Sequence, residues 1–363
     1  MAWLGVIFML AVAMTALSML AFSEDDGAYR GEGLLTVHYL DVGQSDCTFV
    51  EVGGEYTMMI DASDEAHADE ICRYVDALGY DSIDLLVLTH SHSDHIGGAA
   101  SVLSALVVER VYMTDGTATG EDAEHLRRVE EMIEAHGVER AVAQEGTEFE
   151  LGGLEGCFLA PGDVYFSDEN EMSAVLSLRY GEQSFLFMGD AGEAAENMLL
   201  RRGADVLATV VKAGHHGSNG SSTQDFVSAA RAEYVVFSCG EGNDYGHPSP
   251  YAVDRWEAAG ARTFRTDRDS TVIACTDGVG ISVMRLSESK LLGDAIFSGS
   301  DTSTYTETVA AEHKYYLNTA SHILHLADCT VFGEELGTNI EPSSEDIARL
   351  RAEGYKTCMH CFE

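Results

Sequence analysis

The sequence predicts an α/β fold built around a metal site, and three observations support this prediction. Leu85–Leu88 is a short apolar run. A loop rich in histidine and aspartate follows it, and after the loop comes a segment rich in alanine and valine. A loop at the carboxyl end of a buried strand is where open α/β sheets hold their ligands. The chain between Thr223 and Thr266 alternates between helical and strand patterns. With 363 residues, 45% of them apolar, the chain can bury a substantial core.

The loop Thr89–Gly98 carries the strongest chemical signal. It reads T-H-S-H-S-D-H-I-G-G and contains His90, His92, Asp94 and His95 within six residues. One histidine alone would be interpreted as a solvated loop residue. Four such groups in this order indicate ligands that converge on a cation such as Zn or Mn.

The elements before this loop form a hairpin ladder and a helix. Leu34–Leu40 is predicted as a strand, and a turn from Asp41 to Cys47 leads into a second strand that ends at Val50. The paired glycines that follow indicate a hairpin turn, because glycine accepts positive φ angles. The chain returns as a strand over Tyr56–Ile60, and Asp64–Leu78 is predicted as a helix.

The elements after the loop extend the same pattern. The predicted strands and helices in chain order are Val107–Met113 (strand), Asp122–His136 (charged amphipathic helix), Phe149–Leu159 (strand pair), Ala174–Tyr180 (strand), Ser184–Met188 (strand), Glu193–Arg202 (helix) and Val206–Val211 (strand). A second half follows with Thr223–Arg231 (helix), Tyr234–Ser238 (strand), Pro250–Ala259 (helix), Thr263–Thr266, Val272–Cys275 and Gly280–Met284 (strands). His125 and His136 are expected to be solvated on their helix.

Four ordered motifs carry a resemblance to a known family. H-x-H-x-D-H followed by G-G resembles the metallo-β-lactamase superfamily. Three further motifs resemble its ComEC-type competence-protein hydrolase branch: D-V-G-Q-S-D from Asp41, K-x-G-H-H-G-S from Lys212, and N-x-Y-G-H-P from Asn243. Ser45 departs from the family pattern, which has glycine there. The resemblance implies an αββα four-layer sandwich over residues 31–285, with a dinuclear site at one edge.

The resemblance also implies a set of metal ligands. His90 and His92 would hold one cation, Asp94 and His95 a second, and Asp190, which follows a strand and Gly189, would bridge the two. One histidine of the pair in K-x-G-H-H-G-S would complete the second site. The alternatives are His215 and His216, and we expect His215 because it is the first after the strand.

Asn170 stands where many superfamily members have a third metal histidine. Three roles remain open for it: binding metal, positioning substrate, or capping the turn before Ser173. An amide oxygen is a weaker zinc ligand than an imidazole. The first cation is therefore expected to be the more weakly held.

Four residues are expected to take part in catalysis or in substrate contact. Asp94 would orient the attacking water. His247 would donate a proton or a hydrogen bond to the leaving group, because histidine titrates near neutral pH, with an ordinary loop histidine as the alternative. Lys212 and Ser218 would contact an anionic substrate, or would simply be a surface lysine and a turn serine. Asp41 is expected to have a structural role near the site, with a metal-ligand role as the alternative.

Two segments flank the predicted hydrolase domain. Met1–Phe22 carries no charge, is long enough to cross a bilayer core of ~30 Å as a helix, and ends at an acidic cluster. Residues 1–30 therefore predict a signal or an uncleaved anchor, with a buried core helix as the alternative. Residues 286–313 are polar, have little periodicity and are expected to be a linker.

Residues 314–363 are predicted to form a small zinc-binding module. An H-x-x-x-C pair at His325 and Cys329 precedes a C-x-x-C pair at Cys358 and Cys361, with Ser343–Glu353 between them predicted as a helix. Three cysteines and one histidine suit a closed structural zinc site, although disulfides are the competing use in an exported domain. The segment resembles the Ada-like zinc-binding tails of some ComEC-like hydrolases. The other five cysteines are expected to be small core residues.

Bulk charge limits the function classes. The chain has 61 acidic and 21 basic residues, a formal net charge of −40. The basic footprint of a typical nucleic-acid binder is absent.

Together the motifs predict an exported or membrane-anchored hydrolase with two divalent cations in its cleft and a phosphodiester substrate, most simply single-stranded DNA. The alternatives are hydrolysis of a small exported phosphoester or lactone, and a surface binding protein that uses its zinc tail without turnover.

Overall fold

The computed structural model describes residues 33–116 and 118–286, together with four short strands further along the chain. The chain separates into two compact units, with the division between Gly299 and Ser300. The first unit contains two large β-sheets and the second a small sheet. Each unit is described separately.

The first sheet has eight strands in the order β15-β14-β1-β2-β3-β4-β5-β6. The strands from β15 to β3 pair antiparallel, whereas β3 to β6 pair parallel. Their bounds are β1 (Leu35–Tyr39), β2 (Thr48–Val52), β3 (Tyr56–Ile60), β4 (Ser82–Leu88), β5 (Val107–Met113), β6 (Glu139–Val142), β14 (Val272–Thr276) and β15 (Ile281–Arg285).

The second sheet has seven strands in the order β13-β12-β11-β10-β9-β8-β7. The strands β10 to β13 are parallel, and β7 to β10 are antiparallel. Their bounds are β7 (Glu148–Leu151), β8 (Leu154–Ala160), β9 (Val175–Tyr180), β10 (Gln183–Phe187), β11 (Val210–Lys212), β12 (Tyr234–Phe237) and β13 (Arg262–Arg265).

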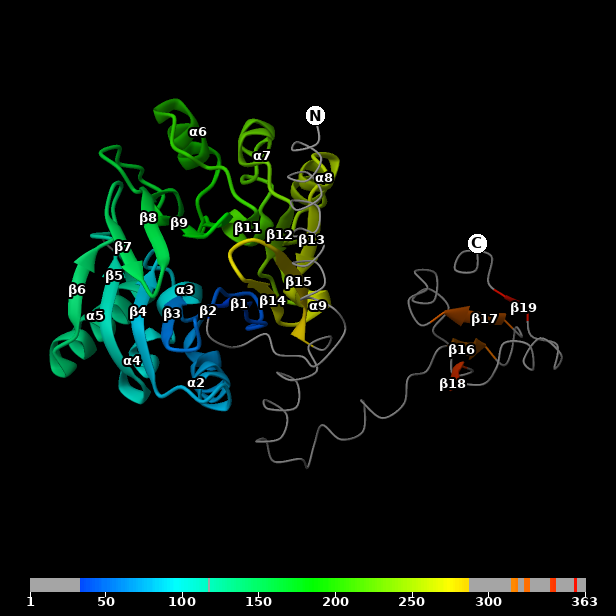
Figure 1. Ribbon diagram of the computed structural model, residues 1–363, viewed down its shortest axis with the longest axis horizontal. Helices are drawn as coiled ribbons and strands as arrows, with labels where there is room; N and C mark the ends of the chain where they lie inside the picture. The colour runs from blue at the N-terminus through cyan, green and yellow to red at the C-terminus, as the bar shows by residue number, and fades with distance from the viewer. Residues whose placement is uncertain are drawn as a thin grey trace, which may run out of the picture. The chain divides into compact units, whose positions relative to one another are not determined.

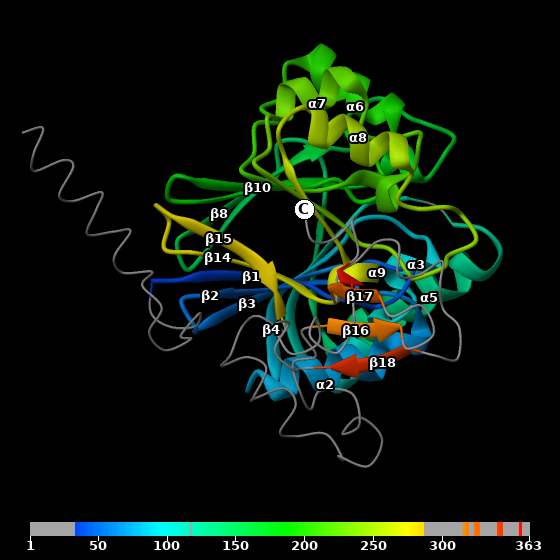
Figure 2. The ribbon, with the colours of Figure 1, turned by 90° about the vertical axis from the view of Figure 1, so that its right-hand side faces the viewer.

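Helices cover the outer face of each sheet, as Figures 1 and 2 show. The helices near the first sheet are α2 (Ala68–Ala77), α3 (Ser93–Ile96), α4 (Ala99–Ala105) and α5 (Gly120–His136). Those near the second are α6 (Glu193–Arg202), α7 (Gln224–Ala230) and α8 (Pro250–Ala258), with the short α9 (Thr266–Asp269) after β13. Three single turns complete the set: η1 (Glu65–His67), η2 (Asn170–Met172) and η3 (Gly214–Gly217).

Three hydrophobic clusters establish the layers. One joins Ile71 of α2 and Val102 of α4 to the first sheet, and another joins Trp256 of α8 to the second. The third lies between the sheets and includes Tyr39 of β1 and Phe185 of β10. Alternate residues of a strand point to opposite faces, so each sheet buries one face against helices and the other against its partner sheet. The predicted four-layer αββα fold is confirmed.

His125 differs from its expected solvated position. It is buried on α5, whereas His136 at the end of the same helix is exposed. His125 precedes Val129 and Ile133 at four-residue steps, and both of these residues belong to the core. Residues at this spacing share one helix face, so His125 lies on the buried face.

The topology brings the polar loops to one edge of the sandwich. In the first sheet β3 and β4 are parallel, and in the second β10, β11 and β12 are parallel. Their carboxyl ends lead to Asp61, to Thr89–Gly98, to Asp190, to Lys212–Ser218 and to the 238–248 loop respectively. Parallel strands therefore collect the motif residues that are far apart in the sequence.

The second unit contains a four-stranded sheet in the order β18-β16-β17-β19. Its strands are β16 (Tyr315–Asn318), β17 (Ile323–Leu326), β18 (Ile340–Ser343) and β19 (Lys356–Thr357). The backbone of His325 lies in β17. Cys329, Cys358 and Cys361 lie outside the described residues, as does most of the helix predicted over 343–353. The zinc-binding module stays a prediction.

The amino-terminal segment also falls outside the described residues. Within the part of the chain that the structure describes, no helix has the length and apolar character that a membrane crossing requires. The anchor or signal prediction for residues 1–30 and the linker prediction for 286–313 stay predictions.

Candidate metal centre

The histidine loop owes its shape to close packing at its end. α3 begins directly after His92, and the Asp122 carboxylate accepts a hydrogen bond from the Ser93 backbone N–H at 2.9 Å. A Cβ atom on Gly98 would lie 2.2 Å from the Ala62 carbonyl oxygen, and one on Gly97 would lie 2.4 Å from that of Ser93. Only glycine allows this approach, which explains the G-G that ends the motif.

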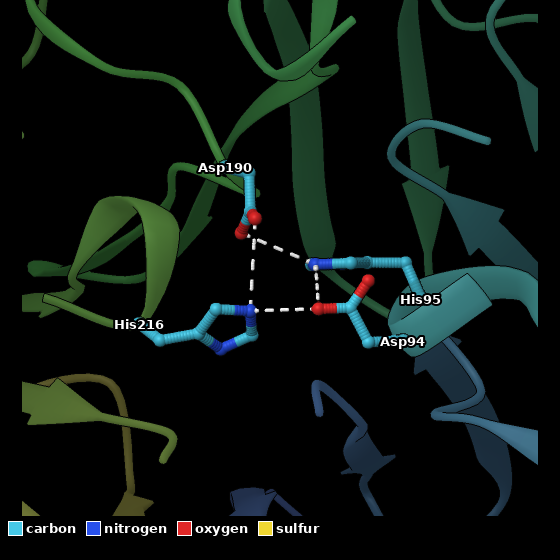
Figure 3. A group of neighbouring side chains, drawn as sticks. All are labelled: Asp94, His95, Asp190 and His216. Carbon is cyan, nitrogen blue, oxygen red and sulfur yellow. Dashed lines mark hydrogen bonds and ion pairs between the residues drawn. The ribbon is translucent and has the colours of Figure 1, made fainter. Parts of the chain in front are cut away.

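Four side chains converge at the edge of the sandwich: Asp94, His95, Asp190 and His216 (Figure 3). One ligand atom from each lies within 4.8 Å of those of the others. His95 Nε2 lies 3.1 Å from Asp190 Oδ1, and His216 Nε2 lies 3.1 Å from Asp94 Oδ2. The residues come from α3, from the loop after β10 and from η3.

The donor set fits a divalent cation. Two carboxylates and two imidazoles suit Zn or Mn. His95 Nε2 and Asp190 Oδ1 are buried and lie 3.1 Å apart without a well-aligned hydrogen bond, and a buried polar atom without such a bond is costly. A cation between them would satisfy both.

Electrostatics keep the two carboxylates ready to bind. Burial alone raises the pKa of Asp190, but His216 and His95 beside it lower that pKa well below its ordinary value. Burial also opposes ionisation of Asp94, yet the neighbouring His95 and His216 lower its pKa to about 2. Both side chains are therefore ionised at neutral pH. The same carboxylates raise the pKa of His95 against the effect of burial, so cation binding would release a proton.

His90 and His92 form a pair beside this cluster. Their atoms Nε2 and Nδ1 lie 3.1 Å apart, and the rings of His90 and His95 are 4.2 Å apart between centroids. Burial, followed by the effect of His95, lowers the pKa of His90 well below its ordinary value, so its ring is neutral and able to bind a cation. His92 Nε2 lies 3.8 Å from Glu169 Oε2. The pair therefore lies next to the four converging residues without belonging to that group.

The geometry favours His216 over the expected His215. His216 is buried and belongs to the cluster, whereas the His215 side chain is 34% exposed and its Nε2 lies 3.7 Å from Asp190 Oδ2. His216 Nδ1 donates to the Ser238 carbonyl oxygen at 3.0 Å, which directs Nε2 toward Asp94 and the other members of the cluster. Both histidines have positive φ angles, 48° and 51°, and this backbone turn aims the second ring inward.

The expected contact between Lys212 and an anionic substrate is also corrected. Its side chain is only 4% exposed, and its Nζ donates to Asp46 Oδ2 and to the Ala213 carbonyl oxygen. Lys212 ends β11, and its ammonium group is buried against Asp46 instead of facing solvent. Ser218 fits its turn alternative, because its backbone N–H bonds to the His215 carbonyl oxygen at 2.7 Å.

Asp46 and Asp61 support the cluster, and sequence reasoning did not single them out. Asp61 Oδ2 accepts from His95 Nδ1 at 2.7 Å and from the Thr89 hydroxyl at 2.7 Å. Asp46 Oδ1 lies 3.4 Å from His216 Nδ1. A carboxylate behind a ligating histidine fixes the ring and its tautomer. The signal was the position of Asp61 at the end of a predicted strand and of Asp46 at the end of D-V-G-Q-S-D.

Asp41, at the start of that motif, is exposed, and its backbone N–H bonds to the Thr271 hydroxyl at 3.1 Å. It lies in the turn rather than in the cluster. This arrangement agrees with a structural role for Asp41.

His247 lies against the cluster. Its ring stacks on His216 with 6.2 Å between centroids and an angle of 21° between planes. Asn243 holds the loop, since its side chain bonds to both the N–H and the carbonyl oxygen of His247. Burial and the two neighbouring histidines lower the pKa of His247 to about 4. Its ring is therefore neutral at pH 7, which suits a hydrogen-bond donor better than a charged acid.

Asn170 lies in η2 and makes no side-chain cap. Its Oδ1 atom is buried without a hydrogen-bond partner, which removes the capping role and leaves metal binding or substrate positioning open. The adjacent Glu171 anchors the segment by accepting from the Ala195 N–H at 2.7 Å. Ser173 Oγ accepts from the Asp190 N–H at 3.0 Å and so ties the same segment to the cluster.

A cavity of about 420 Å³ opens beside His90. Ser91 and Glu169, joined by a 2.6 Å hydrogen bond, lie along it together with Gln144, Tyr165 and Phe166. Its volume is in the range of small-molecule sites.

The expected core role of the five cysteines between residues 33 and 286 agrees with their placement. Cys47, Cys239 and Cys275 are buried, and Cys72 and Cys157 are partly buried.

The fold and this ligand geometry define a metallo-hydrolase class. The family model of the metallo-beta-lactamase superfamily matches residues 40–241, which is more than half of the chain. The chain belongs to this superfamily.

Curated relatives are competence proteins. The chain is 26% identical over 253 residues to ComE operon protein 3 of Bacillus subtilis, covering 65% of this chain and 32% of that protein. It is 29% identical over 266 residues to competence protein ComA of Neisseria gonorrhoeae, covering 71% and 35%. The chain thus spans about a third of the length of these relatives. The resemblance to the ComEC-type branch is confirmed.

Solved structures are more distant. A metallo hydrolase from Ignicoccus hospitalis is 19% identical, with a TM-score of 0.44, covering 66% of this chain and 98% of that one. The family assignment therefore rests on the sequence match and on the cluster.

Proposed function

We propose that this protein is a metal-dependent phosphodiesterase and that its substrate is single-stranded DNA. The convergence of Asp94, His95, Asp190 and His216 carries the proposal. The similarity to competence proteins supports DNA as the substrate.

Divalent cations, when bound, would lower the pKa of a water and stabilise negative charge that develops on phosphate oxygens. His95, His216, Asp94 and Asp190 would hold one cation, and His90 with His92 would contribute to a second. Asn170, with its buried free oxygen, is a further candidate ligand for that second cation.

The protein's own side chains have distinct tasks. The Asp94 side chain is 34% exposed, whereas those of His95, Asp190 and His216 are almost fully buried. Asp94 is therefore the cluster carboxylate that an incoming water reaches, and it orients that water by accepting its hydrogen bond. The neutral His247 donates a hydrogen bond to the leaving group.

Charge favours a single strand over a duplex. A net charge of −40 gives little attraction for the dense phosphate backbone of double-stranded DNA. A flexible single strand presents one phosphodiester at a time to the cations.

The second candidate is hydrolysis of a small phosphoester or lactone. The cavity beside His90 favours it, because its volume suits a small molecule.

We also propose that the hydrolase is exported or membrane-anchored through residues 1–30 and carries a structural zinc in residues 314–363. The uncharged run Met1–Phe22 and the four candidate ligands His325, Cys329, Cys358 and Cys361 support these proposals.

A substrate panel tests the choice of substrate. Full-length protein loaded with Mn is expected to hydrolyse a single-stranded oligonucleotide faster than the same sequence as a duplex. Chromogenic phosphoesters and lactones serve as the competing substrates, and Asp190→Asn measures the background. Turnover of the small esters without turnover of the oligonucleotide would favour the second candidate.

A further inference from the structure

Aromatic rings form a continuous row through the cluster. The successive ring-centroid distances are 4.2 Å from His90 to His95, 5.4 Å from His95 to His216, 6.2 Å from His216 to His247 and 5.7 Å from His247 to Tyr245. The row starts at the wall of the cavity and ends at an exposed tyrosine.

Tyr245 presents a free ring face at one end of this row. It is 74% exposed, and its ring plane is 25° from that of His247. The bonds from Asn243 to both sides of the loop fix the ring near the cluster. Apart from this contact with His247, the ring is open to solvent beside the cluster.

The cavity provides aromatic surface at the other end. Tyr165, which is 78% exposed, and Phe166 lie along it, and His90 forms its inner wall. The described side chains that line it include no lysine or arginine. Two lining carboxylates, those of Asp115 and Glu145, are paired with Arg140 and Arg202.

The lack of lysine and arginine among the described side chains that line the cavity decides how a substrate is recognised there. Lys212 is the only lysine between residues 33 and 286, and it is buried against Asp46. Affinity from phosphate contacts requires lysine or arginine side chains that displace counterions. Stacking of bases on aromatic rings requires neither, and every base has a face to stack.

We propose that Tyr245 and the Tyr165–Phe166 wall are two ring subsites on which bases of a single strand stack, with the phosphodiester between them at the cluster. This inference rests on the proposed function. Bases paired in a duplex are stacked on one another and cannot use these subsites. A small ester would fill the cavity and leave Tyr245 without a role.

Direct binding tests the subsites independently of turnover. Fluorescence anisotropy of the full-length, Mn-loaded protein would use a labelled oligothymidylate with phosphorothioate linkages, which slow hydrolysis. An abasic oligomer of the same length and charge is the second probe. Tyr245→Ala and Tyr165→Ala are each expected to weaken oligothymidylate binding about tenfold, whereas binding of the abasic oligomer stays unchanged.

Three substitutions serve as controls. Tyr245→Phe and Tyr165→Phe keep the ring and are expected to bind like the wild type. Tyr56→Ala removes an exposed tyrosine at the opposite end of β3 from Asp61 and is expected to have no effect. The inference would be overturned if Tyr245→Ala bound oligothymidylate as tightly as the wild type does. It would also be overturned if the wild type bound the abasic oligomer as tightly as oligothymidylate. Ring-dependent binding without hydrolysis of an unmodified oligonucleotide would instead contradict the proposed function.

Discussion

Replacing Lys212 by methionine is expected to lower the free energy of unfolding by roughly 3–5 kcal/mol, because it leaves the Asp46 carboxylate buried without its partner. Both side chains are almost fully buried. Lys212 and the two nearby histidines hold the pKa of Asp46 far below its ordinary value against the effect of burial, so the carboxylate stays ionised. Urea unfolding followed by circular dichroism measures the change.

Two further variants sharpen this test. The double variant Asp46→Asn with Lys212→Met removes both charges and is expected to recover part of the lost free energy of unfolding. The reason is that the loss in Lys212→Met comes from leaving the Asp46 charge buried without its partner. Arg127→Met removes an ion pair with Glu124 and Glu131 on the exposed face of α5 and is expected to leave unfolding unchanged. If Lys212→Met unfolds at the same urea concentration as the wild type, the buried pair does not hold the loops together.

Replacing His216 by alanine is expected to weaken cation binding by about a hundredfold or more, because it removes one of four converging ligands. His215→Ala is the matched control, since it removes the neighbouring imidazole from outside the cluster. It is expected to change the affinity by less than about tenfold. Competition between the protein and a fluorescent chelator for Mn or Zn measures both. A larger loss in His215→Ala than in His216→Ala would restore the assignment that the sequence favoured.

The difference between these histidines shows where sequence reasoning stops. Two adjacent histidines after a strand are equivalent in the sequence. Their roles depend on two successive positive φ angles and on the Ser238 carbonyl that binds the His216 ring. The contact with Ser238 has no local signal in the sequence, because Ser238 lies 22 residues away.

Lys212 shows the same limit for burial. A lysine at the end of a β-branched strand can point to solvent or into the sandwich. Its partner Asp46 stands 166 residues earlier, so the ion pair exists only once the two sheets pack together. In contrast, the order of strand, loop and helix around Thr89–Gly98 can be recognised from neighbouring residues in the sequence. The same is true of the hydrophobic pattern of β1 to β4. These features allowed the fold and the position of the cluster to be predicted.

Asp61 and Asp46 were missed for a related reason. A ligand histidine is recognised by its residue type and spacing, whereas the carboxylate behind it is one of 61 acidic residues. Only the folded geometry distinguishes the Asp61 oxygen, 2.7 Å from His95 Nδ1, from the many solvated carboxylates.

The most direct test of the central claim measures hydrolysis before and after cation removal. Full-length protein is expected to cleave single-stranded DNA, to lose this activity when treated with a chelator, and to regain it on addition of Mn or Zn. Asp190→Asn, with its fold checked by circular dichroism, is expected to cleave at least about a hundredfold more slowly, because one of the four converging groups is lost. Cleavage at the wild-type rate by the chelated protein or by Asp190→Asn would contradict a metal-dependent hydrolase at this cluster.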